Sequence, residues 1–433
     1  MNNMRNLIKM VLCAMVLVQA VACKKDLYDK EQYQRYLKYM SPVDSVDQRH
    51  DWKLTAKKQY SFQADAGNHI KKVMVLDVDP LNNKQANVMN QATISDGGSS
   101  TFDVSVPLAQ TTLYAALVDA EGRFYVTSFP VIQKEAVSFK NATSAIPTNL
   151  SLNPQTYTYC YEKDLPLAGD YDYNDLVIRL GIEKDSEKPH QVTLQLTINA
   201  VGCTNQIAAF VRLCSFGKND VENITTTDGK TFNDNLPAGS KGLTDMTSTF
   251  QWGRRSDAVI CLFADAHWAM NNTLETSANA GAISRKNYNV LSDISYNQLD
   301  QYESMVYSKQ SYVITFTNED LARNFTLEDI DPFIITLYNG GRFETHLDYY
   351  KNAEVLYEYK LEQDIKDLPW ALIIPSESFQ YPLEGQQMGF RKYSSTGIAY
   401  NDGAYPDFGE WVENYEACRD WYKRPNEQKV WGF

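Results

Sequence analysis

Apolar residues at every second position are the feature that most constrains how this chain folds. The alternation is clean over residues 192–198 (VTLQLTI) and 102–106 (FDVSV). Because successive side chains of a β-strand point to opposite faces, this pattern predicts strands that bury one face. Helical periodicity is confined to 318–324, so we predict a mainly β protein with few short helices. Continuous apolar runs, which suit fully buried strands, occur at 73–78, 113–118, 176–178, 259–263, 312–316 and 333–337.

The predicted strands fall into two groups. In the first group, two apolar runs flank a short turn that ends at Gly122, a pattern typical of a β-hairpin. Strands at this spacing predict a small immunoglobulin-like β-sandwich over 56–150. The stretch 138–156, rich in Asn, Thr, Ser and Pro, is typical of a linker. The second group predicts a larger β-sandwich domain over 155–433.

Charge and motifs exclude several classes of function. The chain has 433 residues, and its 54 acidic residues outnumber 41 lysines and arginines, which gives a formal net charge of −13. Such a surface repels phosphate backbones and no basic patch interrupts it, so we expect no nucleic-acid partner. The sequence has no GxGxxG, phosphate-loop or HExxH motif. We therefore predict that the protein is not an enzyme.

The first 22 residues have the features of a secretory signal peptide. Two basic residues precede an apolar stretch, 10–18, that is too short to span a membrane. The following AVAC stretch ends at Cys23 and resembles the lipobox of bacterial lipoproteins, in which the Cys thiol carries the diacylglycerol. We predict lipidation of Cys23, with ordinary cleavage after Ala22 as the alternative. A polar stalk is predicted over 23–55.

The charged residues that directly follow Cys23 (KKDLYD) suggest a cellular location. They resemble the tails of Bacteroidetes lipoproteins, in which such residues act as a surface-export tag. This resemblance implies a protein that is lipid-anchored in the outer membrane and exposed at the cell surface.

An acidic loop before the apolar run 176–178 is the sharpest local feature. Ca²⁺ takes about six to eight oxygen ligands, and crowded carboxylates repel one another unless a cation neutralises them. The loop therefore predicts a structural calcium site, with a solvated acidic turn as the alternative. A glycosidase carboxylate pair is disfavoured, because carboxylates of one loop do not flank a sugar ring from both sides. The candidate ligands are Asp170, Asp172, Asn174 and Asp175, with Glu162 and Asp164 earlier in the chain.

The cysteines of the mature chain form no zinc-binding pattern, because no CxxC spacing occurs. Their number is odd, so they do not all pair. A bridge between Cys203 and Cys214 and buried free thiols both fit the sequence. The five cysteines are Cys160, Cys203, Cys214, Cys261 and Cys418.

Two further residue patterns have both a structural and a functional interpretation. Glu344 and His346 lie two apart and share one face of a strand, which favours a hydrogen bond at a sheet edge over a metal pair, because no third ligand is evident. Four of the seven tryptophans lie in the last 64 residues. Exposed tryptophans would stack on sugar rings, but tryptophan is usually mostly buried, so we expect a core role.

The motifs of the second region resemble the LruC-type domain of bacterial lipoproteins over about 155–433. The similarity rests on GDYDYND at 169–175, DPFI at 331–334, GRFETHL at 341–347, LPWA at 368–371, FQYPLE at 379–384, AYPDFGEW at 404–411 and DWY at 420–422. The resemblance implies an envelope lipoprotein with no established activity.

Together these features predict a surface-exposed outer-membrane lipoprotein with a calcium-stabilised β domain. The membrane is contacted through the lipid anchor, and the expected role is binding, adhesion or envelope structure with a glycan or protein ligand. The first alternative is a glycan-binding lipoprotein of a polysaccharide uptake system. The second, less favoured alternative is a carbohydrate-active hydrolase.

Overall fold

Strands dominate the computed structural model of the chain, which confirms the mainly β prediction. The signal peptide, Cys23 and the stalk as far as residue 44 lie outside the described residues, as does Asp164. Among the described residues, no helix has the length and apolarity that a membrane span requires. The structure describes residues 45–162, 170–234, 236, 243, 246, 248–253, 256–271, 287–290, 307–338, 341–347, 368–393 and 399–431.

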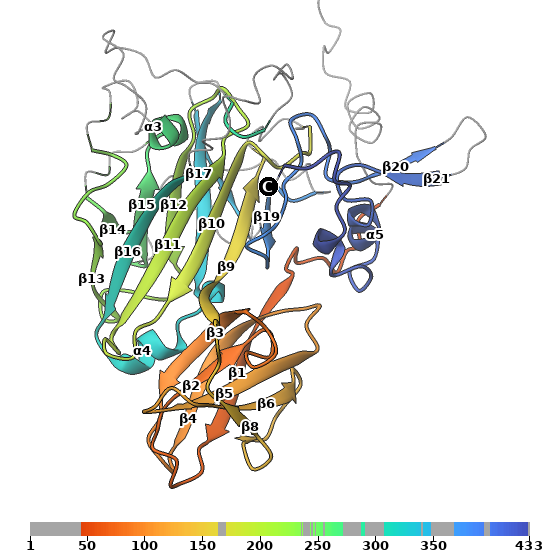
Figure 1. The fold of residues 1–433 in the computed structure, drawn as a ribbon. Coiled ribbons are helices and arrows are strands. Elements are labelled where there is room, and N and C mark those ends of the chain that lie inside the picture. The colour runs from red at the N-terminus through yellow and green to blue at the C-terminus, as the bar shows by residue number, and fades with distance from the viewer. Residues whose placement is uncertain are drawn as a thin grey trace, which may run out of the picture.

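The first strands form a small sandwich, at the bottom of Figure 1. One sheet has the order β4-β1-β7, and the other has β3-β2-β5-β6-β8. Pairing of β1 with β4, of β2 with both β3 and β5, and of β5 with β6 follows the immunoglobulin-like pattern, as predicted. The strands are β1 (Thr55–Gln63), β2 (Ile70–Leu76), β3 (Gln85–Thr93), β4 (Ser99–Pro107), β5 (Thr112–Asp119), β6 (Phe124–Pro130), β7 (Val137–Ser138) and β8 (Thr143–Ala145).

The turn between β5 and β6 is the predicted hairpin turn. The Asp119 carboxylate accepts hydrogen bonds from the backbone N–H groups of Glu121 at 2.8 Å and Arg123 at 2.9 Å. Gly122 has a φ of +80°, which favours a residue without a Cβ. Aspartate thus supplies the hydrogen-bond acceptor for the backbone of this turn, and glycine supplies the positive φ.

A single long strand, β9 (Ser151–Tyr161), joins the two domains. Its first four residues pair in parallel with β3, and the following residues pair antiparallel with β10 (Leu176–Glu183). One sheet therefore runs from the small sandwich into the large one, and Figure 1 shows β9 rising between them. The predicted linker stretch, 138–156, contains β8 and the first half of β9.

The large sandwich packs two sheets face to face. One sheet continues as β13-β16-β11-β10-β9, with β19 on the other side of β9, and the second has the order β14-β15-β12-β17-β18. These strands are β11 (Gln191–Ala200), β12 (Ala208–Leu213), β13 (Val221–Thr226), β14 (Phe250–Trp252), β15 (Ala258–Phe263), β16 (Ser308–Phe316), β17 (Ile330–Tyr338), β18 (Gly341–His346) and β19 (Ala371–Ile374). The short helices are α3 (Ala266–Asn271), α4 (Glu319–Asn324), η3 (Leu327–Asp329), α5 (Phe408–Glu413) and η4 (Trp421–Lys423).

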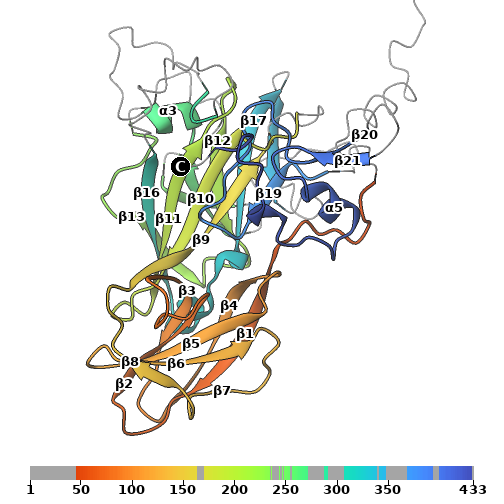
Figure 2. The same cartoon turned by 45° about the vertical axis from the view of Figure 1, so that its right-hand side comes forward.

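A third layer covers the outer face of the β9–β10 sheet. This C-terminal layer, residues 368–393 and 399–431, enters through β19, which pairs with β9, and includes α5, β20 (Phe390–Tyr393) and β21 (Ala399–Asp402). Figures 1 and 2 both place its α5 and the β20–β21 hairpin on the side of β19. On β10, Ile178 faces the sandwich core while Val177 faces the C-terminal layer, so β10 is buried on both faces.

The tryptophans of the C-terminal layer are core residues. Trp411 and Trp421 are 0% exposed, with ring centroids 5.9 Å apart. Trp370 and Trp431 are each 3% exposed. This agrees with the expected core role, and these four rings offer no exposed stacking surface for a sugar.

Candidate metal centre

The acidic loop lies where β9 ends and β10 begins. Tyr161, the last residue of β9, pairs with Leu176, the first residue of β10. Glu162 directly follows the one strand, and Asp175 directly precedes the other. Antiparallel pairing therefore brings Glu162 beside the Asp-rich segment, although about ten residues separate them in the chain.

Three carboxylates of this loop converge on one point. Glu162, Asp170 and Asp172 each have a carboxylate oxygen within 4.8 Å of the others. Glu162 is 0% exposed and Asp172 is 1% exposed, whereas Asp170 is exposed at the mouth of the cluster. Oxygens that bind Ca²⁺ lie about 2.3–2.6 Å from the ion, so a separation of this size is compatible with one shared cation.

One buried oxygen of the cluster receives no hydrogen bond from the described residues. Glu162 Oε1 is buried and accepts no hydrogen bond within the described part of the chain. The other oxygen, Oε2, accepts a long bond of 3.4 Å from the Tyr173 backbone N–H. A buried carboxylate oxygen without a donor is costly unless a cation or a proton compensates it. The residues present thus fit a cation that prefers oxygen ligands.

The pKa values of the buried carboxyls report the same need for compensation. Burial raises the pKa of Glu162 well above its ordinary value, and repulsion from Asp175, Asp172 and Asp170 adds to the shift. Burial also raises the pKa of Asp172 to about 9, with Asp170 and Asp175 adding to it. The metal-free site therefore favours protons on these groups, and a divalent cation would replace them.

Asn174 supports the cluster from its side. Its Nδ2 donates to Asp172 Oδ2 at 2.9 Å and to the Pro382 carbonyl oxygen at 3.1 Å. Its Oδ1 faces Gly202, where an added Cβ would lie only 2.1 Å away. The sequence predicted Asn174 as a ligand, and this stays a prediction, because its Oδ1 is buried and accepts no hydrogen bond from the described residues. Its Nδ2 meanwhile orients Asp172.

The backbone on either side of Asp172 is strained. Tyr171 has a φ of 59° and Tyr173 has a φ of 54°, a region in which a residue with a Cβ costs roughly 1–3 kcal/mol. Two contacts hold these residues in place. Met388 N–H donates to the Tyr171 carbonyl at 2.8 Å, and the Tyr173 hydroxyl donates to the Pro369 carbonyl at 2.8 Å.

The Glu344–His346 pair belongs to a separate, buried ionic network. His346 Nε2 lies 3.2 Å from Glu344 Oε2, as the favoured hydrogen-bond interpretation predicts. Its Nδ1 lies 2.8 Å from Asp331, which also contacts Arg212 at 3.3 Å. Burial lowers the pKa of His346, but the two carboxylates outweigh it and raise the pKa to about 9. The sequence missed Asp331 and Arg212, which come from other strands.

All five described cysteines are free thiols, so the bridge between Cys203 and Cys214 does not form. Cys160, Cys203 and Cys261 are buried, and burial raises the pKa of the Cys160 and Cys261 thiols. These thiols behave as small apolar side chains, which was one of the two open interpretations.

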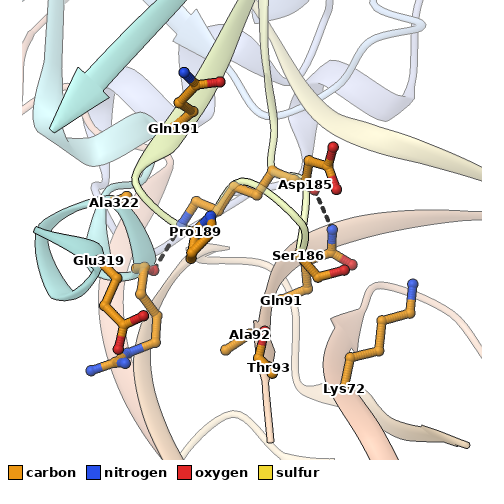
Figure 3. Close-up of a pocket in the computed structure, with 12 residues that line it drawn as sticks. Lys72, Gln91, Ala92, Thr93, Asp185, Ser186, Pro189, Gln191, Glu319 and Ala322 are labelled. Carbon is orange, nitrogen blue, oxygen red and sulfur yellow. Dashed lines mark hydrogen bonds between the residues drawn. The ribbon is translucent and has the colours of Figure 1, made fainter.

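A small cavity at the domain junction is drawn in Figure 3, where Lys72 and Gln91 of the small sandwich lie opposite Asp185 and Pro189. Its volume of about 90 Å³ has room for a few water molecules. Lys184 lines it and donates to Asn90 Oδ1 and to the Arg323 carbonyl, both at 2.8 Å. Burial lowers the pKa of Lys184 to about 7. We interpret this cluster as a fastening between the domains.

A larger crevice of about 880 Å³ lies between the small sandwich, the β9–β10 sheet and the C-terminal layer. Its charged groups balance, with Asp77 and Glu377 against Arg179 and Lys423. The rest of its polar lining is mainly carboxamide, and each carboxamide both donates and accepts hydrogen bonds. These side chains belong to Asn83, Gln85, Asn87, Gln110, Asn153, Gln155 and Gln380.

Comparison with known protein families gives one match by sequence. Residues 188–422, more than half of the 433-residue chain, match the family described as "Domain of unknown function (DUF4842)". The match includes most of the large sandwich and of the C-terminal layer, and it begins after the acidic loop. No curated protein matches the chain.

Two solved structures are similar to the chain at low identity. One is a Bacteroides ovatus protein assigned as a lipoprotein, with 15% identity, a TM-score of 0.48, and coverage of 84% of this chain and 99% of that one. The other is the full-length major pilin SpaD of Corynebacterium diphtheriae, with 9% identity, a TM-score of 0.14, and coverage of 80% and 86%. Neither TM-score supports an argument about function.

Proposed function

This chain belongs to the family described as a domain of unknown function (DUF4842), and we propose, from its own residues, a role for it. In this proposal the protein is a surface-exposed outer-membrane lipoprotein. In this proposal Cys23 carries the lipid and Ca²⁺ stabilises the large β domain. The role is binding, adhesion or envelope structure, without catalysis. The LruC-type resemblance of residues 155–433 supports the envelope assignment.

The observation that carries the calcium proposal is the buried Glu162 oxygen beside Asp172 that accepts no hydrogen bond from the described residues. The cluster offers carboxylate oxygens, which suit Ca²⁺, whereas Zn²⁺ prefers nitrogen and sulfur. Mg²⁺ demands a tighter octahedral shell and keeps its waters, so it fits a strained loop of fixed shape less well. The ligands that we propose are Glu162, Asp170, Asp172, Asn174 and Asp175, while Asp164 lies outside the described residues.

The test is a thermal melt of residues 24–433 in EDTA, in Mg²⁺ and in Ca²⁺. A ligand specific for the folded state adds about 2.7 kcal/mol to the free energy of unfolding at a hundredfold excess over Kd. Ca²⁺ should therefore raise the Tm more than Mg²⁺ does. Asp172→Ala should abolish the rise, and the control Asp65→Ala, at an exposed position of the small sandwich, should retain it. Identical melting in all three buffers, without bound metal, would leave the solvated-turn alternative.

The carboxamide-lined crevice favours a second candidate, which is the capture of a neutral glycan. Sugar hydroxyls both donate and accept hydrogen bonds, as carboxamides do, and the balanced charge suits an uncharged ligand. The test is calorimetric titration with a panel of neutral oligosaccharides. Asn153→Ala should weaken any binding, while Asn68→Ala on an exposed loop should not. If no oligosaccharide of the panel binds, this candidate is removed. Turnover of the same panel would instead support the hydrolase alternative.

A further inference from the structure

A cavity of about 540 Å³ lies where the large sandwich meets the segment that leads into β1. Its walls come from residues 51–55, from the end of β12 and the start of β17, from η3 and from β19. It shares no lining residue with the carboxamide-lined crevice. Sites for small molecules typically have volumes of about 300–1,000 Å³, so this cavity has the size of a ligand site.

A buried ion pair forms the polar part of the lining. Arg212 and Asp331 lie directly opposite each other on β12 and β17, and Arg212 Nη2 is 3.3 Å from Asp331 Oδ2. Their side chains are only 5% and 7% exposed. Even so, neither Arg212 Nε nor Asp331 Oδ1 makes a hydrogen bond with the described residues. A buried donor or acceptor without a partner is costly, so a ligand that supplies partners for both atoms would be bound favourably.

The charges around the cavity narrow the class of ligand. A plain anion would satisfy Arg212 but would be repelled by the neighbouring carboxylates. A plain cation would leave Arg212 Nε without an acceptor. A ligand that carries both charges meets both requirements. The described lining has four carboxylates, of Asp51, Asp257, Glu328 and Asp331, and two basic groups, of Lys53 and Arg212.

The rest of the lining suits an apolar group. Five aliphatic side chains line the cavity, and all of them except Leu347 are buried. An apolar ligand group that leaves water for such a wall gains about 25 cal/mol per Å² of buried surface. The five residues are Leu327, Ile330, Leu347, Ala371 and Ile373.

We propose that this cavity binds a free α-amino acid with an apolar side chain. An α-amino acid carries its carboxylate and its ammonium group on one carbon, so both charges can reach the adjacent Arg212 and Asp331. Arg212 Nε donates to the carboxylate, the ammonium group donates to Asp331 Oδ1, and the side chain lies along the aliphatic wall. This site is independent of the calcium loop and of the glycan candidate, so it is tested separately from both.

The experiment is a calorimetric titration of residues 24–433 with L-leucine, L-isoleucine, L-methionine and L-phenylalanine. We expect at least one of them to bind with a stoichiometry of one to one. The N-acetyl derivative of that amino acid lacks the ammonium group, and its primary amide lacks the carboxylate. Each derivative should bind at least about tenfold more weakly, because it leaves one buried group without its charged partner.

Three variants locate the site. Leu347→Trp should fill the cavity from its partly exposed side without changing the ion pair, so that affinity falls at least about tenfold. Leu337→Trp makes the same change at a 43% exposed position of β17 outside the lining, and it should bind as the unmodified chain does. Arg212→Lys keeps the charge but loses the planar fork of donors, and it should also weaken binding. Thermal melts show whether each variant is folded.

Each outcome bears on the proposal. If none of the four amino acids binds, the proposal is wrong. If the N-acetyl derivative or the amide binds as tightly as the parent amino acid, recognition of both charges is overturned. If Leu347→Trp binds with unchanged affinity, the ligand lies elsewhere and this site is overturned. Loss of affinity in Leu347→Trp and in both derivatives, with full affinity in Leu337→Trp, would support the site.

Discussion

His346 is held between two carboxylates in a buried part of the second sheet. Its side chain is 1% exposed and lies 2.8 Å from Asp331 and 3.2 Å from Glu344. The folded pKa of about 9 is above the ordinary value of 6.5. The folded state therefore binds this proton more tightly than the unfolded state does, and the protonated imidazole contributes to stability.

The sign of the shift predicts the pH dependence of this contribution. It is fully present below about pH 6.5 and is lost as the pH rises through about 9. Glu344→Gln should lower the folded pKa of His346 and move the loss to lower pH. Chemical denaturation at pH 6, 7.5 and 9, with an NMR titration of the imidazole, measures both effects. An unchanged His346 pKa in Glu344→Gln would contradict this account of the network.

Gly202 is a second position at which a single added atom, a Cβ, should change the stability of the protein. A Cβ there would lie 2.1 Å from Asn174 Oδ1 and 2.6 Å from the Asn174 carbonyl oxygen. We expect Gly202→Ala to lower the free energy of unfolding by roughly 1–3 kcal/mol and to weaken Ca²⁺ binding, because Asn174 orients Asp172. Gly217→Ala, whose nearest contact is 3.2 Å, is the control. Equal stability and equal affinity in the two variants would show that Asn174 has room to shift.

The spacing of acidic residues was enough to locate the loop and its central residue, Asp172. It did not reveal what holds Asn174 in place, because its contacts with Pro382 and Gly202 come from distant parts of the chain.

At the scale of elements, α4 connects the two domains through its ends. The Asn318 side chain caps its N-terminus by accepting from the Leu321 N–H at 3.0 Å. At the other end, the Arg323 carbonyl accepts from Lys184, and Asn324 Oδ1 accepts from the Asp103 N–H at 3.3 Å. Fraying of this helix would therefore loosen the domain junction.

Removal of the Asn318 cap tests whether the domain junction depends on α4. Asn318→Ala removes the acceptor for the first turn of α4, which typically costs about 1 kcal/mol. We expect a lower Tm and faster amide hydrogen exchange in α4 and at Asp103, with exchange in β5 unchanged as the internal control. Exchange that rises only within the helix would show that the junction does not depend on α4.

Element prediction succeeded where periodicity was strong and failed where the chain changes partners. The alternation over 192–198 became β11, and the single helical stretch became α4. In contrast, the predicted linker over 138–156 includes the first half of β9, which contains Asn153 and Pro154. A parallel pairing with β3 tolerates this proline at the point where the strand passes from one domain to the other. A strand that passes from one domain to another has no uniform pattern of apolar residues along its length.

At the scale of the whole molecule, the chain that leads from the predicted anchor is packed against the C-terminal layer. The Asp47 N–H donates to the Val412 carbonyl at 2.9 Å, and His50 Nε2 lies 2.8 Å from the Trp411 carbonyl. The ring of His50 also stacks on Trp52, with centroids 4.2 Å apart. The segment from residue 45 is thus part of the folded body, and a free stalk can extend only over the residues before it.

Membrane attachment then depends on Cys23, which we predict to carry the lipid. Each buried CH₂ group of an acyl chain contributes about 0.8 kcal/mol to membrane binding, so two chains hold a protein firmly where one alone binds reversibly. Cys23→Ser removes the thiol that carries the diacylglycerol. We expect the full-length variant, expressed in a bacterium that processes lipoproteins, to leave the membrane fraction or to accumulate unprocessed, while Cys418→Ser remains membrane-bound. Cys23→Ser protein that still incorporates labelled fatty acid and stays in the membrane would disprove the assignment of the anchor.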